Sequence, residues 1–153
     1  MTTPPPPPPP GYGPPPPGYG PPPPAAGGEL ASWGSRVQSG IVDYFGLSIL
    51  AVFVQLAISR PLGGLIGLAA LGWGLYNGYL QGQTGQSTGK KMAGTRLINM
   101  QTGQPIGGGA GIGRAIVHIV DAIPCYLGFL WPLWDGQKQT FADKILSTVV
   151  VKA

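Results

Sequence analysis

Asp43 is an ionisable residue in an otherwise apolar stretch that runs from residue 40 to residue 58 of this 153-residue chain. Arg36 precedes it by seven residues, so in a helix the two side chains lie on one face, about 10.5 Å apart along the axis. An aspartate at membrane depth costs roughly 2.5–3.5 kcal/mol on insertion scales, which makes a functional role the default hypothesis. Arg36 lies just before the stretch, where its long side chain can reach the membrane surface.

A second group of ionisable residues lies in the apolar stretch from residue 113 to residue 134. Arg114, His118 and Asp121 are spaced at i, i+4 and i+7, which places them on one face of a helix. Ionisable residues in such a stretch usually pair with one another or mark a path for ions.

Two interpretations of these side chains are open. In the first, Asp43, His118 and Asp121 form a proton or cation relay, with His118 titrating near neutral pH. Arg114 then serves as a counter-charge. In the second, the same side chains hold helices together. Arg36 then pairs with Asp43. Arg114 likewise pairs with Asp121, and His118 forms a hydrogen bond between helices.

Other chemistry is not indicated. One histidine, the single Cys125 and scattered carboxylates do not form a metal-ligand cluster, and no catalytic triad or dinucleotide fingerprint is present. Residues 85–91 lack one spacer residue of a phosphate-binding loop and have Lys91 where that loop needs a hydroxyl. We therefore expect no catalytic residues, no metal, no cofactor and no enzyme activity.

The composition points to a membrane protein. Charged residues make up 9% of the chain, against roughly 25% in an average soluble domain. Fifteen of the 19 prolines lie in residues 4–24, so the remainder is more apolar than the whole. The nine Lys and Arg residues are scattered, which argues against a nucleic-acid partner and for the lipid bilayer as the surroundings.

Three apolar segments, at about residues 39–59, 62–80 and 113–134, have close to the length that crosses a bilayer. Arg60-Pro61 breaks the first from the second, which predicts an antiparallel two-span helical hairpin. The third segment is interrupted by prolines. It is either a re-entrant hairpin, which we favour, or one kinked third span.

The distribution of basic residues predicts the orientation. Lysines and arginines gather in the loop of residues 81–112 and in the C-terminal segment, so both are expected in the cytoplasm together with the N-terminus. Residues 95–100, followed by the turn sequence QTGQP, indicate a short strand, and residues 147–152 are rich in β-branched residues and indicate another. The two are expected to pair in a small cytoplasmic sheet, because neither is stable alone. The predicted fold is thus an all-α membrane protein with this possible β element.

Small residues recur along one face of the second span, in two G-x-x-x-G pairs. Such a face lets helix backbones approach closely in lipid. The partner is either the first span or another chain, as in a homo-oligomer. The face consists of Gly63, Gly67, Ala70, Gly74 and Gly78.

Residues 1–30 are expected to be a disordered tail that precedes a membrane domain of residues 31–153. Proline runs favour the extended polyproline II conformation, and such a tract cannot bury enough apolar surface to fold. The tail is either a solvated spacer or a docking arm for a cytoplasmic partner, since P-P-G-Y occurs at residues 9–12 and 16–19.

The chain resembles the RDD family of small bacterial membrane proteins over about residues 31–153. The resemblance is carried by W-x-x-R-x-x-x-x-x-x-D at residues 33–43, by G-Q-S-T-G-K-K-M-A-G-T-R-L at 85–97 and by Q-T-F-A-D-K-I-L-S-T-V-V-V at 139–151. The one arginine and two aspartates of the family name correspond by position to Arg36, Asp43 and Asp143. Asp121 is the less secure match for the second aspartate.

The resemblance implies a multi-pass protein of the bacterial inner membrane, in a family whose activity is largely undefined. Some members are linked to sodium/proton exchange. If Asp143 is the second aspartate, it is expected to cap structure near Lys90, Lys91 or Arg96.

Two functions follow as hypotheses. The protein is an accessory or scaffold component that associates with a membrane partner through its glycine-rich helix face. Alternatively, it is a cation/proton exchanger that works as an oligomer, because one chain is too small to build two gates around a site.

Overall fold

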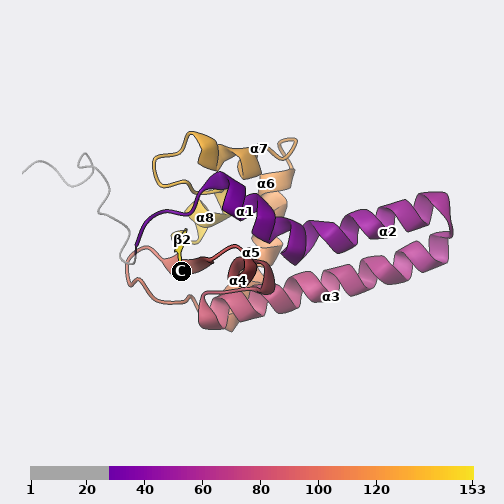
Figure 1. The fold of residues 1–153 in the computed structure, drawn as a ribbon, viewed down its shortest axis with the longest axis horizontal. Coiled ribbons are helices and arrows are strands. Elements are labelled where there is room, and N and C mark those ends of the chain that lie inside the picture. The colour runs from indigo at the N-terminus through magenta and orange to yellow at the C-terminus, as the bar shows by residue number, and fades with distance from the viewer. Residues whose placement is uncertain (1–27) are drawn as a thin grey trace, which may run out of the picture.

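The computed structural model describes residues 28–153, so the predicted tail of residues 1–30, with its two possible roles, lies almost wholly outside the described residues. A long helical hairpin extends from a head that contains the sheet and the short helices (Figure 1).

The elements follow one another in a simple order. The helices are α1 (Trp33–Gly40), the π-helix η1 (Ile41–Phe45), α2 (Gly46–Ala57), α3 (Arg60–Thr84), α4 (Thr88–Met92), α5 (Gly108–Val117), α6 (Ile119–Ala122), α7 (Leu127–Leu130), the 3₁₀-helix η2 (Trp131–Leu133) and α8 (Phe141–Ile145). The strands are β1 (Thr95–Asn99) and β2 (Thr148–Lys152).

The predicted hairpin is present. The continuous helix of α1, η1 and α2 packs against α3, and the turn between them precedes Pro61 in the first turn of α3, where proline is tolerated. Gly85 ends α3 with a φ of 79°, a left-handed conformation that favours glycine.

The small-residue face of α3 packs within the chain. Toward the hairpin tip, a Cβ added at Gly63 would overlap Gln55, so the two helix backbones are in close contact there. At the head end, a Cβ added at Gly78 would lie 2.9 Å from the Gly111 carbonyl oxygen of α5. The partner is therefore the first span at one end, as expected, and α5 at the other, which was not expected.

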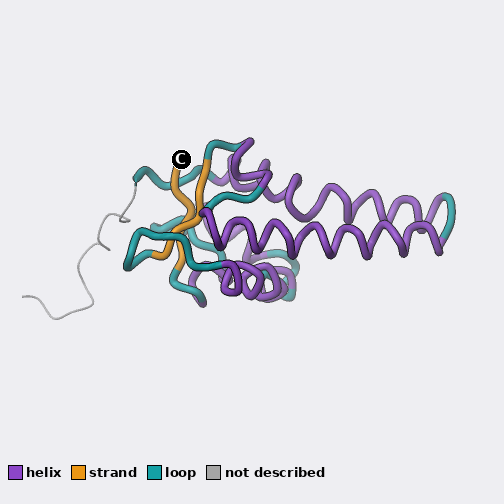
Figure 2. Tube along the Cα trace, turned by 90° about the horizontal axis from the view of Figure 1, so that it is seen from below, coloured by secondary structure: helices purple, strands orange, loops and turns teal. Residues whose placement is uncertain are grey.

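The third apolar segment is sharply bent. The helical segments Gly108–Ala122 and Leu127–Leu133 are bent by 103° at the break between them. In Figure 1, α5 runs across the hairpin at its base and not along it, and Figure 2 shows from below that the strands and short helices gather at one end of the hairpin. A helix of 15 residues is only about 22 Å long, so neither limb alone reaches across a 30 Å hydrocarbon layer.

The two strands pair as predicted. β1 and β2 are antiparallel, with Thr95 opposite Lys152 and Asn99 opposite Thr148. Leu30 forms an isolated bridge with Val151, so the start of the described chain joins the same sheet. The segment of residues 100–147 therefore begins and ends next to the two-stranded sheet.

Among residues 28–153, one continuous helix, Trp33–Ala57, is long and apolar enough to cross a membrane, or two if the bent pair counts as one span. The second predicted span, 62–80, has the length within α3, but its glycines and Asn77 reduce its hydropathy. Only a small fraction of the first helix is buried inside the protein, and large apolar side chains of the hairpin face outward. Leu56 is 81% exposed and Leu68 is 68% exposed.

Candidate functional site

Asp143 is held between two arginines from distant parts of the chain. Its Oδ2 lies 2.8 Å from Nη1 of Arg36 on α1, and its Oδ1 lies 2.6 Å from Nη2 of Arg114 on α5. Nε of Arg114 also donates to Oδ1 over 3.1 Å. All three side chains are largely or wholly buried, so this cluster fixes α1 and α5 to the start of α8.

The backbone around Asp143 positions the carboxylate. Thr140 and Asp143 form a reciprocal capping box at the start of α8, and the Thr148 hydroxyl donates to Oδ1 over 3.0 Å. Burial opposes ionisation, but the charges of Arg114 and Arg36 outweigh it and hold the pKa of Asp143 far below its usual range. As expected, Asp143 caps a helix, but the helix is its own, and its ion-pair partners are Arg36 and Arg114 and not Lys90, Lys91 or Arg96.

Asp43 does not pair with Arg36, contrary to the structural hypothesis. Its carboxylate accepts a short hydrogen bond from the Ser87 hydroxyl and one of 2.7 Å from the Gly89 backbone N–H. Both donors belong to the turn that starts α4, and the Asp43 side chain is fully buried. Asp43 therefore anchors the loop after α3 to the first span.

Asp121 does not pair with Arg114, which binds Asp143 instead. Its Oδ1 accepts hydrogen bonds from the backbone N–H groups of Phe141, at 2.7 Å, and Ala142, at 3.3 Å. Its Oδ2 lies 2.6 Å from Nδ1 of His118. Asp121 thus joins α6 to the start of α8.

Of the three relay candidates, the structure joins His118 with Asp121, whereas the hydrogen bonds of Asp43 go to a different element, α4. Asp43, Asp121 and Asp143 are fully buried. Each accepts hydrogen bonds from fixed protein donors.

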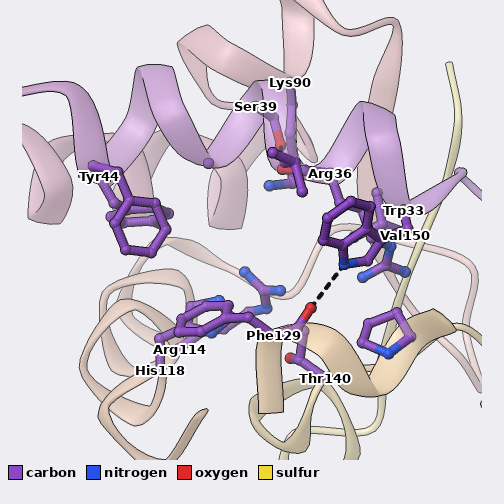
Figure 3. Close-up of a pocket in the computed structure, with 14 residues that line it drawn as sticks. Trp33, Arg36, Ser39, Tyr44, Lys90, Arg114, His118, Phe129, Thr140 and Val150 are labelled. Carbon is purple, nitrogen blue, oxygen red and sulfur yellow. Dashed lines mark hydrogen bonds between the residues drawn. The ribbon is translucent and has the colours of Figure 1, made fainter. Parts of the chain in front are cut away.

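A pocket of about 120 Å³ opens beside the cluster of Arg36, Arg114 and Asp143 (Figure 3). Figure 3 shows Arg36 and Lys90 on the side of α1, with Arg114, His118 and Phe129 on the facing side. Its wall holds three cationic side chains and no carboxylate among the lining residues. The other lining residues are Trp33, Val37, Ser39, Gly40, Tyr44, Phe45, Pro132, Thr140 and Val150.

Several site residues were missed by the sequence reasoning. Lys90 is 5% exposed, and burial is the main reason that its pKa falls to about 8. Gln81 accepts a hydrogen bond from Arg114 over 3.3 Å and donates one to the Tyr44 hydroxyl over 2.9 Å. The run of residues 85–97, one of the three motifs that carry the family resemblance, contains Ser87 and Lys90 and was the signal for these positions.

The sequence profile of the RDD family matches residues 30–147. The chain belongs to the RDD family. The match confirms the resemblance, and the matched residues include Arg36, Arg114 and Asp143 of the arginine–aspartate cluster. Of the positions that the resemblance matched to the family name, Arg36 and Asp143 are the partners of one buried ion pair.

The chain is similar to several curated proteins. It is 44% identical to the "Proline-rich antigen homolog" of Mycobacterium tuberculosis over 106 residues, or 63% of this chain and 43% of that protein. It is 49% identical to the "Proline-rich antigen" of Mycobacterium leprae over 85 residues, or 56% of this chain and 33% of that protein. An uncharacterized protein of Bacillus subtilis, YxaI, is 38% identical over 78 residues, which is 50% of each chain.

The RDD chain described here thus spans half or less of the length of these curated relatives. No solved structure matches it.

Proposed function

We propose that this RDD protein is an accessory component of the bacterial inner membrane, with a hairpin that crosses the lipid and a head fixed at the cytoplasmic surface by buried charges. The observation that carries the proposal is that the carboxylates of Asp43, Asp121 and Asp143 are already occupied by hydrogen-bond donors of the protein. Each carboxylate accepts a hydrogen bond from an element other than its own. Asp43 links the first helix to α4, Asp121 links α6 to α8, and Asp143 links α8 to α1.

The apolar surface supports the placement in lipid. Large apolar side chains project from both arms of the hairpin, and contiguous exposed apolar surface of this kind marks contact with lipid or protein. The distance along the first helix from Arg36 to Ile58 is about 33 Å, close to the thickness of the hydrocarbon layer. A hairpin tip at one surface of the membrane therefore places the charge cluster at the other.

The sheet supports a shared side for both ends of the domain. Leu30, β1 and β2 are hydrogen-bonded together, so the N-terminal flank, the loop after α3 and the C-terminus lie on one side of the hairpin. The basic residues of these segments favour the cytoplasm. The segment with α5, α6 and α7 then begins and ends on the inner side of the membrane, and the tail has access to a cytoplasmic partner.

The glycine-rich face is not the surface that a partner uses. It is covered by the chain's own first span and by α5, which changes the scaffold hypothesis as derived from the sequence. A membrane partner or a second copy has to contact the outward-facing apolar residues, such as Leu68 on α3 or Ile123 after α6, which is 75% exposed.

A flux assay tests the proposal against the exchanger alternative. The full chain is reconstituted in liposomes with an imposed sodium gradient, and internal pH is followed with a trapped dye. We expect the rate of empty liposomes, while a sodium/proton ionophore collapses the gradient in the same vesicles. Flux well above background in the wild type that is lost in Asp43→Asn would overturn the accessory role and establish an oligomeric cation/proton exchanger.

A further inference from the structure

The pocket beside the cluster contains cationic side chains with hydrogen-bond donors that the described residues leave without acceptors. Within residues 28–153, neither Nε nor Nη2 of Arg36 has a hydrogen-bond partner, although both atoms are buried. The Lys90 residue is 5% exposed, and its ammonium group forms no ion pair or hydrogen bond with a side chain among residues 28–153. Buried polar atoms without partners are unfavourable, so the two Arg36 nitrogens need a ligand or ordered water, and the Lys90 side chain lines the same cavity.

The nearby carboxylates do not fill this need. Asp143 is shared between Nη1 of Arg36 and the guanidinium of Arg114, and Asp43 is occupied by Ser87 and Gly89. Both carboxylates lie outside the lining of the pocket. What faces the cavity from three separate elements is therefore positive charge.

The size and the walls of the pocket restrict the occupant. One water needs roughly 10–15 Å³ on this measure of volume, so a cavity of about 120 Å³ holds much more than a single bridging water. Guanidinium and ammonium donors that approach from several directions suit a tetrahedral oxyanion. The remaining wall includes Trp33, Phe129 and Pro132, which suit an apolar part of the same molecule.

We propose that this pocket binds the phosphate group of a phosphoester, with Arg36 and Lys90 as its donors and Arg114 as a further positive charge behind them. The group comes from the headgroup of an anionic membrane lipid or from a free phosphate compound. In either case, its negative charge offsets the cost of burying Lys90. The site does not depend on whether the protein moves ions, so the flux assay neither establishes nor removes it.

Lys90 and Lys91 provide a matched pair of variants. Lys90→Gln removes the buried charge from the pocket, whereas Lys91→Gln makes the same chemical change at an exposed neighbouring position. Because the Lys90 charge has no carboxylate partner among the described residues, its removal is not expected to unfold the protein. Thermal unfolding in detergent verifies that both variants fold.

The experiment measures retained lipid and stabilisation by phosphate on the full chain. Nanodiscs of equal parts phosphatidylglycerol and phosphatidylcholine are disrupted, and lipid that stays on the protein is counted by native mass spectrometry. We expect one phosphatidylglycerol retained in at least tenfold preference by the wild type and by Lys91→Gln, and no preference in Lys90→Gln. If the source is a free compound, inorganic phosphate raises the unfolding temperature of the wild type and of Lys91→Gln in neutral detergent, and Lys90→Gln does not respond.

The proposal is overturned by two results. One is the absence of both lipid preference and stabilisation by phosphate in the wild type, which would mean that the pocket contains water only. The other is an equal response of Lys90→Gln and Lys91→Gln, which would mean that the phosphate group binds to the surface.

Discussion

Arg36 and Asp143 lie 107 residues apart in the chain, and their side chains form an ion pair of 2.8 Å at the junction of the first helix and the head. Arg114 completes the cluster from the opposite side, so one carboxylate joins three elements that do not follow one another in sequence. A buried carboxylate between two guanidiniums is costly to disrupt, since removal of one partner leaves uncompensated charge.

Asp143→Asn is expected to destabilise the protein by about 3–5 kcal/mol, because two buried guanidinium groups lose their counter-charge. The measurement is thermal or denaturant unfolding of the full chain in detergent. The matched control is Glu29→Gln, which removes a carboxylate from the exposed pair with Lys152 and is expected to leave unfolding unchanged. Equal effects of the two substitutions would contradict a structural role of the buried cluster.

Gly89→Ala is expected to destabilise the protein by about 1–3 kcal/mol. An added Cβ would overlap the Ser39 carbonyl oxygen and lie 2.9 Å from Oδ1 of Asp43, so α4 would have to move from the first helix. Gly109→Ala, in α5, is the control, because nothing lies within 4 Å of its added Cβ. Unfolding temperatures that rise for Gly109→Ala and fall for Gly89→Ala agree with the structure, and an unchanged temperature in Gly89→Ala does not.

Asp121→Asn is expected to be milder than Asp121→Ala. The asparagine oxygen still accepts hydrogen bonds from the backbone N–H groups of Phe141 and Ala142, whereas alanine leaves both donors without the carboxylate. We expect the alanine variant to lose about 1–3 kcal/mol more of the unfolding free energy. If the two variants unfold alike, the contact with His118 and not the link to α8 determines the role of Asp121.

The pH dependence of lipid retention is expected to follow Lys90. Burial is the main cause that lowers its pKa to about 8, Arg114 and Arg36 act in the same direction, and Asp43 and Asp143 oppose them. Phosphatidylglycerol keeps its charge over this range, so its preferential retention should fall as pH rises from 6.5 through 8 to 9.5. Retention that stays level across this range would contradict the role of the Lys90 charge.

The same pKa affects stability in the absence of lipid. An unfolded lysine keeps its proton to about pH 10.4, so between about pH 8 and that value the unfolded state binds more protons. This contribution therefore makes the ligand-free protein more stable as pH rises through that range. Lys90→Gln removes this pH-dependent contribution. The measurement compares how the unfolding free energies of the wild type and of Lys90→Gln change with pH in this range.

The sequence predicted the elements better than the partners of the charged residues. Apolar length and Arg60-Pro61 locate the hairpin, and a strand–turn pattern at 95–105 and a β-branched run at 147–152 locate the two strands to within a residue, because these signals are local. The ion pairs were predicted from helical spacing and proved wrong. Asp143 reaches Arg36 across the fold, which spacing along one helix cannot reveal.

Backbone partners were also beyond sequence reasoning. Asp43 and Asp121 bind the N–H groups of Gly89, Phe141 and Ala142, and any non-proline residue offers such a donor, so its identity gives no signal. The burial of Lys90 depends in turn on the position of α4.

The membrane arrangement is tested most directly by labelling single cysteines in intact bacteria with a membrane-impermeant thiol reagent. Cys125 is replaced by serine, and one cysteine is introduced at the hairpin tip (Arg60→Cys), in the loop after β1 (Thr102→Cys) or at the C-terminus (Ala153→Cys), all at exposed positions. We predict that intact cells label only the tip variant and that the other two react after permeabilisation. Labelling of the C-terminal variant in intact cells, or equal labelling of all three, would contradict a hairpin that crosses the membrane with both ends of the domain on its inner side.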